Sequence, residues 1–123
     1  MKSFYITLCL FIIMLAFISV NQAYVRSFSE TLIRACEQMD GTLSHEEVVQ
    51  KAEWILNEWS DNKHFLQITV AHSEIESIDN AVDELWIYAS QGDPVEFEKA
   101  RQISLNAFEA LGLAERLTFN NIL

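Results

Sequence analysis

Four side chains that could bind a cation follow one another along a predicted helix over residues 63–91. They are His72, Glu76, Asp79 and Asp83. Separations of four, three and four residues place them along one flank of the helix. Carboxylates suit Ca²⁺ or Mg²⁺, and imidazole suits softer metals. This spacing is common by chance in an acidic helix, and no Glu-x-x-His pair is present to build a di-iron site. A solvated acidic face is therefore the favoured interpretation, and a metal site is a weak alternative.

A second polar contact could join His72 to Glu115. If the helices on either side of Gly92 fold back on each other, residues equidistant from that turn meet. His72 then comes level with Gly112, three residues from Glu115. We expect a structural hydrogen bond between the two side chains. A pH-sensitive latch is the alternative, because imidazole changes its charge near neutral pH.

Composition argues against several classes of function. The chain has 123 residues, 18 acidic and 8 basic, with a formal charge of −10. A negative net charge repels the phosphates of nucleic acids instead of neutralising them, so we expect no nucleic-acid partner. The three glycines are isolated, and neither G-x-S-x-G nor C-x-x-C occurs. We expect no cofactor and no enzymatic activity, because catalysis needs convergent polar groups and nothing in the pattern specifies them.

Trp54 departs from the pattern of its predicted helix. It falls about 130° from the centre of the apolar stripe on that helix, which is made by Val48, Ala52, Ile55 and Trp59. A tryptophan on a polar face often anchors a binding partner, and another helix of a bundle could equally cover it. Trp54 is therefore a candidate partner-binding residue.

The end of the chain is a second candidate partner surface. Its candidate residues are Phe119, Asn121, Ile122 and Leu123. A tail with so many apolar side chains favours docking over free solvation. It can dock into the helical domain or into a partner.

The two cysteines cannot form a disulfide within the chain. Cys9 lies in an apolar segment, whereas Cys36 belongs to the domain that follows. Cys36 shares a helical apolar face with Phe28, Leu32 and Met39, so we expect a small buried hydrophobic residue. An intermolecular disulfide in an oxidising compartment is the alternative.

Residues 4–20 form an uncharged apolar segment, FYITLCLFIIMLAFISV. As a helix it would be about 26 Å long, near the lower limit for a hydrocarbon core of roughly 30 Å. A cut after Ala23 or after Ser19 would lack the pair of small residues that cleavage requires. We therefore predict an uncleaved transmembrane signal-anchor helix. A cleaved signal peptide is the alternative.

The orientation of this anchor follows from its short N-terminal flank. Lys2 precedes the segment, and Arg26 and Arg34 follow it, so the count of basic residues is nearly balanced. Residues 1–3 resemble a cytoplasmic n-region, which predicts that residues 24–123 form an acidic extracytoplasmic domain of a single-pass protein of the cytoplasmic membrane. Acidic residues beside anionic lipid would repel this domain from the surface, which favours a protein partner over a lipid one.

The elements that must position these residues are helices. Apolar periodicity predicts helices over residues 27–39, 44–60, 63–91 and 94–118, with a break at Ser60-Asp61-Asn62 and a linker at residues 21–27. Continuation of the first helix from the anchor is the alternative. Ser44 with Glu47 forms a capping box, and Gly92-Asp93-Pro94 ends one helix and begins the next. Short turns between such helices predict an all-α, antiparallel up-down bundle.

Several of these features resemble one protein family. They are the anchor, Ala52-Glu53-Trp54 with Trp59, His72-Ser73-Glu74-Ile75 with Asp79, and Glu115 with Leu117-Thr118 and the closing Asn121-Ile122-Leu123. Together they resemble domain-of-unknown-function family 4363, short membrane-anchored helical proteins of spore-forming Gram-positive bacteria. The resemblance implies an all-helical extracytoplasmic domain and a YetF-type membrane protein as a possible partner. It implies no catalytic residue.

The sequence leads to two hypotheses of function. The first is a non-enzymatic, membrane-tethered bundle that binds another membrane or envelope protein through Trp54 and the C-terminal tail. The second is a sensory bundle that responds to a cation or to pH through the acidic flank around His72 and through Glu115.

Overall fold

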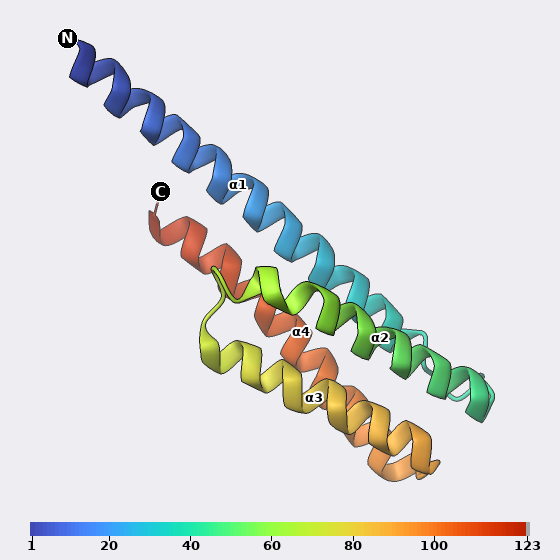
Figure 1. Ribbon diagram of the computed structural model, residues 1–123. Coiled ribbons are helices and arrows are strands. Elements are labelled where there is room, and N and C mark those ends of the chain that lie inside the picture. The colour runs from blue at the N-terminus through green and yellow to red at the C-terminus, as the bar shows by residue number, and fades with distance from the viewer. Residues whose placement is uncertain (123) are drawn as a thin grey trace.

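A computed structural model describes the backbone of residues 1–122 and the side chains of residues 1–113 (Figure 1). Its four helices are α1 (Lys2–Glu37), α2 (His45–Leu66), α3 (His72–Gln91) and α4 (Pro94–Ile122). Successive helices run in opposite directions, and α4 packs against both α1 and α3. The predicted all-α, up-down bundle is confirmed, and no strand occurs in residues 1–122.

The apolar segment and the first helix of the bundle are a single helix, α1, of 36 residues. The predicted linker at residues 21–27 is wrong, because this stretch is helical. Neither glycine nor proline interrupts the chain before Gly41, and burial begins within the expected linker, at Val25. The anchor segment and the bundle are therefore connected by continuous helix.

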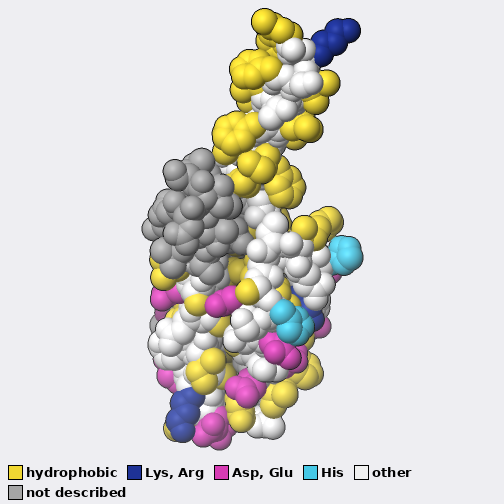
Figure 2. All heavy atoms as spheres, turned by 90° about the vertical axis from the view of Figure 1, so that its left-hand side faces the viewer, with side chains coloured by type: hydrophobic (Ala, Val, Ile, Leu, Met, Phe, Trp, Pro, Cys, Tyr) yellow, Lys and Arg dark blue, Asp and Glu magenta, His cyan; other side chains and the backbone are white. Residues whose placement is uncertain are grey.

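The N-terminal part of α1 projects beyond the other helices (Figure 1). Within the described residues, α1 is one helix whose length and composition suffice to cross a membrane, and its most apolar stretch is not buried against the rest of the chain. Apolar side chains cover this projection in the view of Figure 2, and acidic side chains gather on the opposite half of the molecule. Apolar and acidic surfaces are thus separated along the long axis.

The boundary between α2 and α3 lies later than the sequence predicts. Residues 60–62 do not interrupt the helix. Asn62 Nδ2 instead donates a hydrogen bond to the Glu58 carbonyl within α2, at 2.8 Å. The apolar stripe that includes Trp59 continues two helical turns further to the buried Leu66. The chain turns at residues 67–71, where the β-branched run Ile68-Thr69-Val70 has low helix propensity.

The predicted start and stop signals of the other helices are confirmed. The Ser44 hydroxyl accepts the Glu47 backbone N–H at 3.3 Å, and Asp93 Oδ1 accepts the backbone N–H of Glu96 at 3.2 Å. Gly92 ends α3 with φ of 73°, a conformation that glycine adopts without strain. These signals are local, so the sequence reveals them directly.

The core is built from buried side chains of all four helices. Its largest fully buried side chains include Trp59, Phe108, Leu32, Met39, Ile55, Ile78 and Leu85. Small residues allow close helix contacts, as the sequence indicates for α4: the Ser104 hydroxyl donates to the Ala81 carbonyl of α3 at 3.2 Å. Cys36 is fully buried, which confirms the prediction of a small hydrophobic core residue.

Candidate functional site

A surface groove of about 590 Å³ lies between α1 and α2. Its walls are Thr31, Arg34, Ala35 and Gln38 from α1, and Glu47, Gln50, Lys51 and Trp54 from α2. Trp54 is the one large aromatic side chain among them, and 44% of its surface is exposed. The structure thus places the predicted partner-binding tryptophan in a concave site and leaves it half uncovered by other helices.

The position of Trp54 follows from the packing of α2. Ala52, Ile55 and Trp59 are buried on the inner face of this helix, so Trp54 must lie on a different face. Ser44 caps the start of α2, and the connecting turn is held by Asp40, which accepts hydrogen bonds from the backbone N–H and hydroxyl of Thr42. These hydrogen bonds lower the pKa of Asp40. The turn therefore sets where α2 begins alongside α1.

The groove is electrostatically distinct from the acidic molecule around it. Lys51 Nζ donates to Gln38 Oε1 across the groove at 2.9 Å, which joins α2 to α1. Arg34 has no ion-pair partner among residues 1–113. Two cations and one carboxylate, Glu47, line the groove, so it suits a segment that offers an apolar side chain beside a carboxylate.

The acidic flank on α3 does not form a metal site. Asp79 accepts Trp59 Nε1 at 2.7 Å and Lys63 Nζ at 2.7 Å, both from α2. His72 is the exposed first residue of α3. Within the described side chains, no three His, Cys, Asp or Glu converge as metal ligands would. Asp79 instead contributes to the contact between α2 and α3. The structure therefore does not bring together the four weak metal candidates, His72, Glu76, Asp79 and Asp83.

Some predicted site residues lie outside the described side chains. They are Glu115, the proposed partner of His72, and the tail residues Phe119, Asn121, Ile122 and Leu123. Their roles stay predictions. Gly112 is expected to lie level with His72 if the helices fold back about Gly92. In the structure it faces Ser29 of α1.

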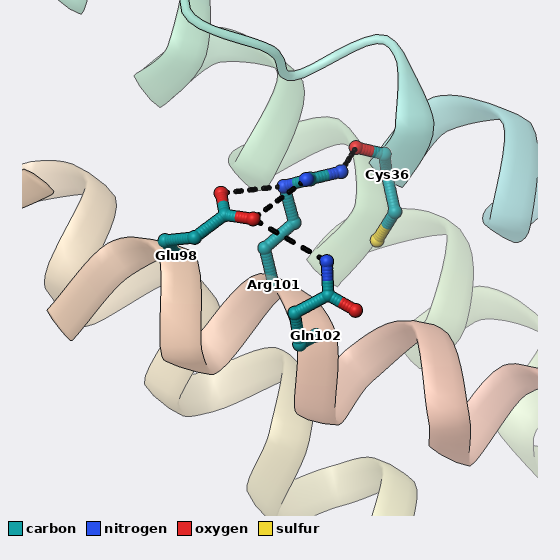
Figure 3. A network of polar contacts seen from close by, with 4 residues as sticks. All are labelled: Cys36, Glu98, Arg101 and Gln102. Carbon is teal, nitrogen blue, oxygen red and sulfur yellow. Dashed lines mark hydrogen bonds and ion pairs between the residues drawn. The ribbon is translucent and has the colours of Figure 1, made fainter. Parts of the chain in front are cut away.

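Arg101 of α4 organises a polar network that the sequence does not reveal (Figure 3). Its Nη1 donates to the Cys36 carbonyl in the last turn of α1 at 3.3 Å, and its Nε and Nη2 donate to Glu98 at 2.9 and 2.7 Å. The Cys36 carbonyl also accepts the backbone N–H of Met39 at 3.1 Å, so Arg101 adds a second partner at the end of α1, where carbonyls lack partners inside their own helix. The i, i+3 pair with Glu98 is visible in the sequence, but the carbonyl on another helix is not.

Two residues of this region have altered pKa values, for different reasons. Hydrogen bonding from Arg101 lowers the pKa of Glu98, and burial raises the pKa of the Cys36 thiol to about 12. A buried thiol that stays protonated is a poor nucleophile. The Arg101 network therefore stabilises the fold.

No family model, curated protein or solved structure matches the chain. Functional interpretation therefore rests on the geometry of the groove and on the apolar projection of α1.

Proposed function

We propose that the protein is a single-pass, membrane-anchored helical bundle that binds a segment of another membrane or envelope protein in the α1–α2 groove. It works as a binding module and not as an enzyme. The observation that carries the proposal is a half-exposed tryptophan, Trp54, in a groove that also contains Arg34 and Lys51.

The groove has the side chains that dominate protein interfaces. Tryptophan and arginine are among the residues most enriched among binding hot spots. Arg34 can hold a carboxylate with two parallel hydrogen bonds. The volume of about 590 Å³ accepts a few side chains of a docked segment. We infer that the partner offers an apolar side chain to Trp54 and an Asp or Glu to Arg34.

The apolar half of α1 supports the anchoring part of the proposal. It is long enough for the hydrocarbon core and is not covered by the bundle. The proposed orientation has residues 1–3 in the cytoplasm and the bundle outside the cytoplasmic membrane. The family resemblance makes a YetF-type membrane protein the first partner to test.

Site-specific photocrosslinking of the full chain in its native membranes tests this function. A photoreactive amino acid replaces Gln50 in the groove, and adducts are identified by mass spectrometry. We expect one predominant membrane or envelope protein. Trp54→Ala should reduce the yield of this adduct by about tenfold or more, because truncating a hot-spot residue typically costs about 2 kcal/mol.

Trp86→Ala is the matched control. Trp86 is on α3, outside the groove, and is 39% exposed, close to the value for Trp54. This variant should leave the adduct yield unchanged. Equal losses in both variants, or no protein adduct at Gln50, would contradict the proposed groove.

A further inference from the structure

The turn between α2 and α3 lies beside α1 where the apolar segment ends. Asn21 Nδ2 donates to Thr69 Oγ1 at 3.1 Å, one residue after Val20. The Tyr24 hydroxyl donates to Asn62 Oδ1 at 2.5 Å, which holds the last turns of α2 against the same part of α1. Because α1 is continuous, these contacts set the height of the turn relative to the apolar segment.

Large apolar side chains are exposed at this height. Phe65 is 61% exposed and Ile68 is 72% exposed. With Phe17 and Val20 of α1 they line a groove of about 420 Å³ between α1 and the end of α2. We name these four residues the turn patch. Its surface continues directly into the apolar surface of α1, so it extends that surface onto the bundle.

The turn patch lies in the part of the chain that lacks charged side chains. Residues 64–73 contain no Asp, Glu, Lys or Arg, and α1 has no charged residue between Lys2 and Arg26. The acidic side chains visible in Figure 2 lie toward the end of the molecule opposite the apolar projection. Among the described side chains, none of residues 64–73 and none of α1 between Lys2 and Arg26 carries a carboxylate, so the expected repulsion between an acidic domain and the membrane is reduced at the turn patch.

The length of the apolar segment places the turn patch at the membrane boundary. Residues 4–20 supply about 26 Å of a hydrocarbon core of roughly 30 Å. The uncharged residues 21–23 supply the remaining distance, at about 1.5 Å each. The boundary then lies at Asn21 to Tyr24, which is the level of Thr69 and of the turn patch. Apolar and aromatic side chains partition favourably into this interfacial layer.

We propose that the turn patch docks the bundle onto the bilayer that α1 spans, with Phe65 and Ile68 inserted at the boundary between headgroups and acyl chains. This inference rests on the proposed anchoring by α1. Docking fixes the bundle with its α2–α3 turn toward the lipid. The Trp54 groove, whose α1 wall begins at Thr31, then starts about 15 Å above Asn21, within reach of the extramembrane part of a neighbouring membrane protein.

Depth-dependent fluorescence quenching of the full chain in phosphatidylcholine–phosphatidylglycerol vesicles tests the inference. An environment-sensitive nitrobenzoxadiazole label is attached to Ile68→Cys, and separately to Phe65→Cys, in a Cys9→Ala background. Cys36 needs no replacement, because it is fully buried. We expect emission shifted to the blue, quenching by lipids with a nitroxide near the headgroup, and protection from aqueous iodide.

Two controls separate failure of docking from failure of anchoring. A label on Val95→Cys, at the exposed start of α4, should be quenched by iodide alone. A label on the native Cys9 should be quenched by nitroxides deep in the bilayer. If Cys9 is deep but positions 65 and 68 are both quenched by iodide, docking is refuted and anchoring stands. If Cys9 is accessible to iodide, anchoring itself is refuted, and docking with it.

Discussion

Asp79 joins α2 to α3 through two side chains of α2. Its oxygens accept the indole N–H of Trp59 and the ammonium of Lys63, each at 2.7 Å. Trp59 is only 1% exposed, so its N–H has no access to bulk water. A buried donor without an acceptor costs about 1–3 kcal/mol. Asp79 therefore contributes to the free energy of unfolding mainly by accepting the hydrogen bond of the Trp59 indole N–H. The part-exposed ion pair with Lys63 adds little.

Asp79→Ala should lower the free energy of unfolding by about 2 kcal/mol, because it leaves the Trp59 indole N–H without its acceptor. The measurement is chemical unfolding of the full chain in detergent micelles, followed by far-ultraviolet circular dichroism. Asp83→Ala, an exposed position one turn later on α3, is the control and should change the value by less than about 0.5 kcal/mol. Equal effects of the two substitutions would contradict this role for Asp79.

The sequence predicts that Trp54 lies off the apolar stripe of its helix, but it predicts neither the exposure of this side chain nor its groove. Helical periodicity places this residue off the apolar stripe, and that information is local. The residues of α1 that complete the groove, such as Arg34, lie across a turn whose path depends on packing. The contacts of Asp79 could not be predicted for the same reason. Its spacing with His72 indicates a shared flank of α3, whereas its hydrogen-bond partners, Trp59 and Lys63, belong to α2.

Small residues allow α1 and α4 to approach closely. The Ser29 hydroxyl of α1 donates to the Phe108 carbonyl of α4, so its orientation is held by a buried hydrogen bond. A Cβ atom at Gly112 would lie 3.2 Å from this Ser29 oxygen, closer than ordinary van der Waals contact. The contact thus depends on the absence of a side chain at Gly112.

Gly112→Leu should destabilise the bundle by about 2 kcal/mol, because forcing extra atoms into a packed contact outweighs the gain in helix propensity over glycine. Unfolding of the full chain in micelles measures this. Gly41→Leu is the matched control: no atom lies within 4 Å of its Cβ position, so we expect a change below about 0.5 kcal/mol. A neutral or stabilising Gly112→Leu would show that the two helices do not meet there.

Helix ends are predictable from the sequence only where local chemistry determines them. Ser44 and Asp93 cap their helices as their neighbours indicate, and Gly92 ends α3. The end of α2 has no glycine or proline to mark it, and burial of Leu66 extends the helix past the polar residues 60–62. The expected linker at 21–27 failed for a related reason, because uncharged polar residues there remain compatible with a helix that is buried at Val25.

At the scale of the whole molecule, α1 combines two tasks. One half carries the apolar surface proposed to cross the membrane, and the other half supplies core residues such as Leu32 and the α1 wall of the Trp54 groove. The 18 acidic residues all follow position 24. Because the helix is continuous between the two halves, the bundle is held at a defined height and angle relative to the apolar segment. Both functional proposals depend on this continuity.

Hydrogen–deuterium exchange of the full chain in lipid nanodiscs tests that continuity most directly. If α1 is one helix, the backbone amides of residues 21–27 exchange at least about a hundredfold more slowly than an unstructured chain, as helical amides packed beside a core do. The backbone amide of the exposed Gly41, in the turn after α1, is an internal reference that should exchange quickly. We expect unbroken protection from residue 6 to residue 36; rapid exchange confined to residues 21–27 would show that α1 is interrupted between the apolar segment and the bundle.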